Sequence, residues 1–246
     1  TVERAAGGWG LTLGFDGDAP SGLDWAVLTA GLPGLVALRI KDKSSSWTAW
    51  GPELLDAGSL DVPLLKTPGA FRQPNDAGAR WLHSHIAELC AGLKPQMAWD
   101  LYGGGGLLGS AALAAGARLW LVEADPLAAA DAEVNLSRLG GGYRVTAGTV
   151  ERALADGPPE SHDKPDLVIL DPPRTGLPKG VIESLVTRRP PLVAYVSCNP
   201  ATFWRDAALL TKGGYEVERL AAFDMLPQTP GVELVGLFHR AGGTPG

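Results

Sequence analysis

The chain has 246 residues, of which 45% are hydrophobic and 20% are charged, proportions that are ordinary for a globular protein. Its net charge of −6 argues against a surface that coats nucleic acid everywhere, although it allows a local basic face. Two cysteines exclude a disulfide framework, and the sequence shows neither a long apolar run nor an export signal, so we expect a cytoplasmic protein without a membrane span.

The first 66 residues differ in texture from the rest of the chain. Short β-leaning segments are separated there by turns rich in Gly, Pro, Asp and Ser. These segments are residues 9–13, 35–40 and 46–50. We therefore expect a small strand-rich N-terminal subdomain over residues 1–66 and a second, catalytic domain over residues 67–246.

From Asn75 onward, helical and strand patterns alternate. Helices are predicted for residues 77–92, for an alanine-rich segment that ends near residue 115, for a segment that begins at Pro126, and for residues 201–210. Strands are predicted for residues 97–101, 119–122, 143–147, 167–170, 192–196, 215–223 and 232–239. Such alternation is typical of the α/β class with a doubly wound, mostly parallel sheet, here of seven strands.

A glycine-rich turn, residues 103–106, follows the predicted strand that leads into Tyr102. Glycine lets the backbone approach a ligand closely, and the next helix presents free N–H groups. Glu123 ends the next strand, where a carboxylate can bind ribose hydroxyls. These features favour a nucleoside cofactor such as S-adenosylmethionine. An NAD enzyme shares the acidic residue, and Glu123 also suits a helix start, so the turn alone leaves the choice open.

The segment Ser197-Cys198-Asn199-Pro200 follows the apolar strand 192–196 and delivers a thiol to its carboxyl end, where open α/β sheets bind ligands. The preceding strand ends in Asp-Pro-Pro-Arg, residues 171–174. This combination suggests a covalent nucleophile. Taken alone, Cys198 equally fits a small buried filler, because free cysteines are among the most buried residues.

Five segments, in this order along the chain, resemble the S-adenosylmethionine-dependent RNA 5-methyluridine (uracil-C5) methyltransferases. They are residues 71–75, the glycine turn, and residues 171–174, 197–202 and 224–233. The likeness runs from about Phe71 to Arg240. It implies a class I (Rossmann-like) methyltransferase fold, S-adenosyl-L-methionine as cofactor, and tRNA or rRNA as the partner.

The resemblance also assigns roles to single residues. Cys198 is the nucleophile that adds to C6 of uracil, and Glu233 is the general base that removes the C5 proton. In a closed site, burial is expected to raise the pKa of Glu233. Arg174 is placed for the RNA or for ordering the site. The residues that match cofactor contacts of the family are Gln73, Tyr102, Glu123 and Asp171. On their own, Asp171 also suits a strand-end turn and Glu233 a surface strand start.

The chain departs from the family pattern at several positions. Gly103 and Leu107 stand where the family usually has Cys and Asn, and Gln228 and Gly231 stand where it usually has His. We expect Leu107 to weaken cofactor binding by about 1 kcal/mol, the typical worth of one hydrogen bond. These departures leave open a cofactor-weakened paralogue that acts as an RNA-binding or assembly factor.

A cytosine-C5 RNA methyltransferase is a second alternative, which we disfavour. Those enzymes carry another cysteine after the fourth strand, where this chain reads Asp-Pro-Pro-Arg. Cys90 and Cys198 are too few for the iron–sulfur cluster of some family members, and no other metal site is expected. We also expect a monomer. The candidate phosphate contacts are Arg174, Arg188, Arg189 and Arg205.

Overall fold

The computed structural model describes residues 2–5, 8–14, 24–41, 47–50, 55–56, 64–67, 70–71, 73–226, 228 and 231–242. The chain divides into two compact units, Thr1–Phe71 and Arg72–Gly246. All of the predicted site residues, from Gln73 to Glu233, belong to the second unit.

The first unit is rich in strands. Its four-stranded sheet contains, in spatial order, β1 (Val2–Ala5), β2 (Gly8–Gly14), β3 (Leu35–Lys41) and β4 (Trp47–Trp50). A two-stranded sheet pairs β5 (Leu55–Asp56) with β6 (Leu65–Lys66). Neither β1 nor the helix α1 (Trp25–Gly31) is predicted from the sequence. Residue 46, the first of the predicted strand 46–50, lies outside the described residues.

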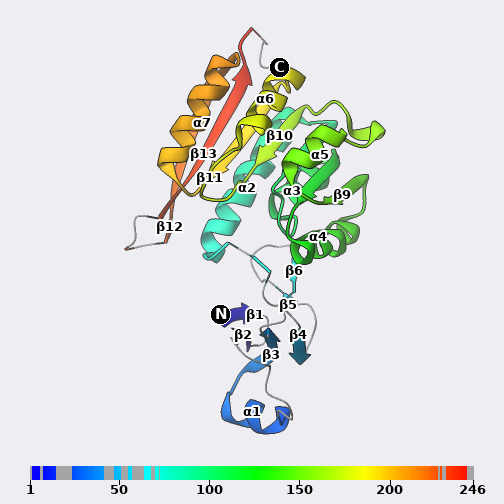
Figure 1. Ribbon diagram of the computed structural model, residues 1–246, viewed down its shortest axis with the longest axis vertical. Helices are drawn as coiled ribbons and strands as arrows, with labels where there is room; N and C mark the ends of the chain where they lie inside the picture. The colour runs from blue at the N-terminus through cyan, green and yellow to red at the C-terminus, as the bar shows by residue number, and fades with distance from the viewer. Residues whose placement is uncertain are drawn as a thin grey trace. The chain divides into compact units, whose positions relative to one another are not determined.

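The second unit is built on a seven-stranded sheet with the order β12-β13-β11-β10-β7-β8-β9 (Figure 1). Its strands are β7 (Met97–Leu101), β8 (Arg118–Glu123), β9 (Tyr143–Ala147), β10 (Leu167–Leu170), β11 (Leu192–Ser197), β12 (Tyr215–Leu226) and β13 (Gly231–Arg240). The first five run parallel, and β13 pairs antiparallel with both β11 and β12. The predicted doubly wound, mostly parallel sheet is confirmed.

Helices cover both faces of this sheet. One core layer joins it to α2 (Asp76–Leu93), α3 (Leu107–Ala114) and α4 (Pro126–Leu139). The other layer joins it to α5 (Val150–Asp156), α6 (Lys179–Arg188) and α7 (Pro200–Lys212). In β10, Val168 and Leu170 belong to the second layer, whereas Leu167 and Ile169 belong to the first. Because both faces are buried, every position of such a strand is apolar.

The helices α5 and α6 are not predicted from the sequence. The first is only seven residues long, although Thr149 caps it by accepting a hydrogen bond from the N–H of Arg152 (3.3 Å). The second begins after Pro178 and has no side-chain cap. The helix α5 is too short to show a clear helical periodicity, and α6 lacks the capping side chain by which a helix start is recognised.

The order of the strands reverses beside β7. The chain steps from β7 to β8 and β9 on one side and then returns to β10 on the other. Open α/β sheets bind ligands at the carboxyl ends of the strands next to such a point. Tyr102 follows β7, Glu123 ends β8 and Asp171 follows β10. The topology therefore brings three predicted cofactor residues to one edge of the sheet.

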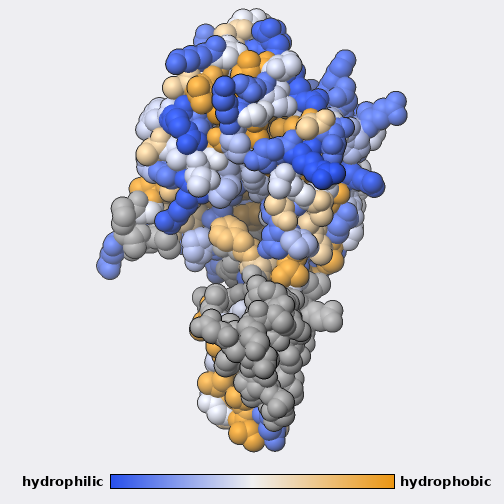
Figure 2. Space-filling model, in the orientation of Figure 1, coloured by the Kyte–Doolittle hydropathy of each residue, from blue (hydrophilic) through white to orange (hydrophobic). Residues whose placement is uncertain are grey.

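Hydrophilic residues predominate on the face of the second unit drawn in Figure 2. Within the described ranges, no helix is both long and apolar enough to cross a membrane. The same residues contain no group of three His, Cys, Asp or Glu side chains arranged to hold a metal ion.

Candidate active site

The thiol of Cys198 lies where β11 gives way to α7. The residue is half-buried, and the next one, Asn199, is the N-cap of the helix: its Oδ1 accepts from the N–H of Ala201 at 3.1 Å. Pro200 follows at the first helical position, where its missing N–H costs nothing. A buried strand, a capping residue and a proline thus fix the chain direction around Cys198.

Glu233 reaches the same edge from β13. Ser197 pairs with Leu234 across the antiparallel β11–β13 ladder, so Cys198 and Glu233 are the next residues at the end of that ladder. Glu233 is only 3% exposed, and burial, aided by the charge of Asp171, raises the pKa of its carboxyl to about 8. The charge of Arg174 acts in the opposite direction. Burial therefore raises the pKa of this carboxyl, which makes its carboxylate a stronger base than an exposed one.

The pKa of the Cys198 thiol is raised as well. Burial, followed by the charge of Glu233, raises the pKa of Cys198 above its usual range. Arg174 opposes this first by its charge and then by its capacity to hydrogen-bond the thiolate. Cys198 is therefore a protonated thiol at neutral pH, and Arg174 is the cation that favours its thiolate.

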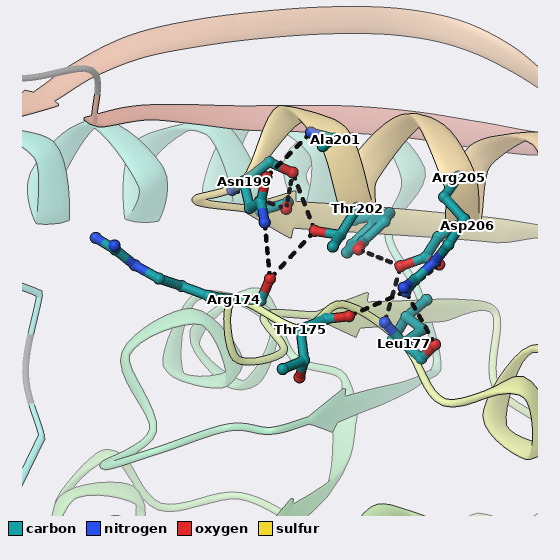
Figure 3. Close-up of polar contacts among 10 residues, drawn as sticks. Arg174, Thr175, Leu177, Asn199, Ala201, Thr202, Arg205 and Asp206 are labelled. Carbon is teal, nitrogen blue, oxygen red and sulfur yellow. Dashed lines mark hydrogen bonds and ion pairs between the residues drawn. The ribbon is translucent and has the colours of Figure 1, made fainter.

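Arg174 is anchored through its backbone. Asn199 Nδ2 donates to the Arg174 carbonyl at 2.9 Å, and Thr202 Oγ1 donates to the same oxygen at 3.4 Å. Figure 3 shows the guanidinium extending away from these contacts. The start of α7 therefore holds both Cys198 and the backbone of the residue whose charge favours its thiolate.

Two predicted cofactor residues from distant segments touch each other. Gln73 Nε2 donates to Asp171 Oδ2 at 3.0 Å, which joins the segment before α2 to the end of β10. Burial raises the pKa of Asp171 to about 7; the Gln73 hydrogen bond lowers it and the charge of Glu123 raises it further. Asp171 therefore follows the end of β10, as a strand-end turn carboxylate does, but it also bonds a side chain from a distant segment of the chain.

Glu123 holds the glycine turn. Its Oε2 accepts from the N–H of Gly104 at 2.8 Å, and its Oε1 accepts from the N–H of Asp125 at 2.7 Å. Asp125, not Glu123, is the N-cap of α4. Each oxygen of a carboxylate accepts more than one hydrogen bond, so Glu123 keeps the capacity to bind hydroxyls.

Sequence reasoning missed Asp100, which ends up fully buried in β7. Its Oδ2 accepts from the N–H of Gly109 at 2.7 Å, and no group among the described residues hydrogen-bonds its Oδ1. Burial raises its pKa to about 7. The signal was a single carboxylate in an otherwise apolar strand. Tyr102 has a left-handed backbone with φ of 67°. Its hydroxyl is likewise buried without a hydrogen-bond partner in the described part of the chain.

Two departures from the family pattern have local packing reasons. A Cβ at Gly103 would lie 2.5 Å from Cγ of Leu121 and 3.0 Å from Asp100 Oδ2, so this turn accommodates glycine only. Leu107 begins α3 and packs against the apolar layer beneath the helix. Its side chain therefore contributes to the core rather than to polar binding.

Two of the arginines predicted to contact phosphate have partners within the protein. The Arg188 guanidinium donates to the Leu154 carbonyl at 3.0 Å and lies over the ring of Trp99. Arg205 pairs with Asp206 and with loop carbonyls. Both Arg188 and its neighbour Arg189 end α6, just before β11 begins, at the edge of the sheet opposite Cys198.

Comparisons with known proteins find similarity to RNA methyltransferases. Residues 161–241 match the family model of tRNA (uracil-5-)-methyltransferases. An uncharacterized RNA methyltransferase of Caldanaerobacter subterraneus subsp. tengcongensis is 35% identical over 193 residues, which are 78% of this chain and 42% of the relative. Another, of Corynebacterium efficiens, is 42% identical over 147 residues, 58% of this chain and 33% of the relative. The chain thus spans less than half the length of these relatives.

Among solved structures, the tRNA (uracil-54, C5)-methyltransferase of Pyrococcus abyssi, in complex with S-adenosyl-L-homocysteine, is similar with a TM-score of 0.74 and 26% identity. The similarity covers 94% of this chain and 56% of that one. Over the part of these proteins that it spans, this chain is therefore similar to RNA methyltransferases, and its C-terminal part to the tRNA (uracil-5-)-methyltransferases.

Proposed function

We propose that this chain transfers a methyl group from S-adenosyl-L-methionine to C5 of a uridine in RNA, and that residues 67–246 form its catalytic domain. The observation that carries the proposal is the meeting of Cys198, Glu233 and Arg174 at one edge of the sheet. A thiol, a buried carboxyl of raised pKa and a cation are the groups that this reaction requires. Similarity to the tRNA (uracil-5-)-methyltransferase family model and to RNA methyltransferases supports the same assignment.

Cys198 acts as the nucleophile in this proposal. Uracil C5 is a poor nucleophile until a thiolate adds to C6, because the addition moves the electron pair of the C5–C6 double bond towards C5. The thiol must first lose its proton, and the Arg174 contact favours the thiolate that results. The residue thereby turns C5 into a carbon that can accept a methyl group.

Glu233 acts as the base. Once C5 carries both its proton and a new methyl group, that proton must leave before the bond between C6 and Cys198 can break. A carboxylate whose pKa has been raised to about 8 by burial is a stronger base than an exposed one. Glu233 therefore takes the C5 proton and allows Cys198 to depart as a thiolate.

The residues at the carboxyl ends of β7, β8 and β10, where the strand order reverses, suit the cofactor. We assign its binding to Gln73, Tyr102, Glu123 and Asp171. Two buried atoms without partners among the described residues, Tyr102 Oη and Asp100 Oδ1, are groups that a polar ligand would satisfy. When bound, S-adenosylmethionine supplies an electrophilic methyl group on a sulfonium. The carboxylates around it favour that positive charge.

The RNA must present its uridine outside a stacked helix. C5 and C6 cannot be reached within paired, stacked bases, so the target lies in a loop or is flipped out. We propose tRNA as the substrate, because the solved relative acts on tRNA, and rRNA as the alternative.

Methyl transfer into unmodified RNA tests this function. With radiolabelled S-adenosylmethionine and separate pools of unmodified tRNA and rRNA, we expect 5-methyluridine in one pool at one position. Binding of the cofactor is followed in parallel by calorimetry. Methylation at another atom would refute the assignment, and RNA binding without cofactor binding would favour the RNA-binding paralogue instead.

A further inference from the structure

The loop between β10 and α6, residues 171–178, is held by a second set of contacts that lies outside the site just described. The set centres on Asp206 of α7, which is fully buried. Its Oδ2 accepts from the N–H of Leu177 and from the hydroxyl of Tyr195, each at 2.8 Å. Its Oδ1 accepts from Nε of Arg205 at 2.8 Å.

Arg205 extends the same contacts to the loop carbonyls. Its Nη2 donates to the Thr175 carbonyl at 3.0 Å and to the Leu177 carbonyl at 3.4 Å, as Figure 3 shows. Gly176, at a φ of 76°, passes so close that a Cβ there would lie 2.5 Å from both Asp206 Oδ2 and Arg205 Nη2. The loop is thus pressed directly onto this pair.

Successive loop residues are therefore fixed by one helix. Asn199 and Thr202 hold the carbonyl of Arg174, and one turn of α7 after Thr202 the residues Arg205 and Asp206 hold the part of the loop that follows it. The same helix begins immediately after Cys198. The position of the Arg174 backbone relative to Cys198 is consequently set by α7 through the loop.

We propose that Asp206, with Arg205, is a positioning residue that holds the guanidinium of Arg174 against the Cys198 thiol. Its importance for methylation rests on the proposed function of Cys198, but its effect on the thiol does not. Asp206 touches neither the thiol nor Arg174 in the contacts above, so it acts only through the loop. Buried, fully hydrogen-bonded networks of this kind commonly fix a single local geometry.

The rate of alkylation of Cys198 as a function of pH reports on this geometry without RNA or cofactor. The thiolate is the reactive species, so its population sets the rate. The charged groups that act on the thiol are Glu233 from β13 and Asp171 and Arg174 from the loop. Peptide mass spectrometry separates alkylation at Cys198 from alkylation at the buried Cys90.

In Asp206→Asn, we expect alkylation of Cys198 at pH 8 to slow by about three- to tenfold, because the guanidinium no longer favours the thiolate. Arg205→Lys changes a partly exposed side chain and should slow alkylation of Cys198 as well. If Asp206→Asn does not fold, the alkylation rate of Arg205→Lys tests the proposal in its place. Lys212→Gln, a charge change at the far end of α7, is the matched control and should leave the rate unchanged. Unchanged or faster alkylation in the folded variants would overturn the proposal.

A double-mutant cycle gives the sharper test. In an Arg174→Ala background, Asp206→Asn should slow alkylation no further, because the group it positions is gone. In the methylation assay, Asp206→Asn should lower kcat by about 10- to 100-fold while KM for the cofactor stays within about twofold. A protein that shows the alkylation shifts but never methylates RNA would refute the proposed function and leave the positioning role intact. Additive effects in the cycle would refute the positioning role alone.

Discussion

Replacing Cys198 by alanine is expected to abolish methylation of uridine in RNA, with a fall in rate on the order of 10⁴-fold or more. In the proposed mechanism the thiol makes the bond to C6 that activates C5, and Cys90, the other cysteine, is buried in α2 on the core side. The measurement is incorporation of labelled methyl groups into unmodified RNA. Binding of the cofactor, measured by calorimetry, should be retained, because the cofactor residues come from other segments.

Cys90→Ala is the matched control for this variant. It removes the other thiol from the core and should cost stability on the order of 1 kcal/mol without loss of turnover. Persistent methylation by Cys198→Ala would mean that no covalent step occurs through this residue. The half-buried cysteine would then be a packing residue of the turn into α7.

Glu233→Gln is expected to stop the reaction at a later stage. Addition of the thiolate to C6 and methylation of C5 do not need the base, whereas removal of the C5 proton does. The variant should therefore accumulate as a covalent complex with RNA, seen as a shifted band on a denaturing gel that requires both the cofactor and Cys198. Glu183→Gln, which changes an exposed glutamate of α6, should turn over normally. Normal turnover by Glu233→Gln would assign the base to another group.

The same substitution should stabilise the fold, and more so at higher pH. The pKa of Glu233 lies at about 8 in the folded protein and at 4.5 in the unfolded chain, so between these values the unfolded chain loses a proton that the folded chain keeps. Stability from this group is therefore present below pH 4.5 and is lost as the pH rises towards 8. Thermal unfolding should show a growing advantage of Glu233→Gln from pH 5 to pH 8, of up to about 4 kcal/mol. If the stability difference between the variant and the wild type stayed constant with pH or reversed, it would contradict the conclusion that this carboxyl is buried in its protonated form.

The sheet was predictable because its strands are buried on both faces. Residues 167–170 read as a short, wholly apolar run, and the structure confirms a strand there with side chains in both core layers. Parallel topology then carries Tyr102, Glu123 and Asp171 to one edge without any further information. The helices α5 and α6 escaped prediction because one is short and the other lacks a side-chain cap.

The surface charges were harder to interpret. A basic residue near Cys198 in the sequence suggests a phosphate contact, but the partner of a guanidinium is decided by tertiary packing. Arg205 lies seven positions after Cys198, yet its guanidinium pairs with Asp206 and donates to the loop carbonyls. Asp100 was missed for a related reason, since only the folded turn shows that its carboxyl meets the N–H of Gly109.

The covalent route through Cys198 is tested most directly with RNA that contains 5-fluorouridine. Fluorine cannot leave C5 as a cation, so the adduct cannot resolve and the protein traps itself on its substrate. After protease and nuclease digestion, mass spectrometry should find the peptide with Cys198 carrying a methylated fluorouridine, and only when S-adenosylmethionine is present. An adduct at another residue, or efficient methylation of ordinary uridine with no adduct on the fluorinated RNA, would contradict the account.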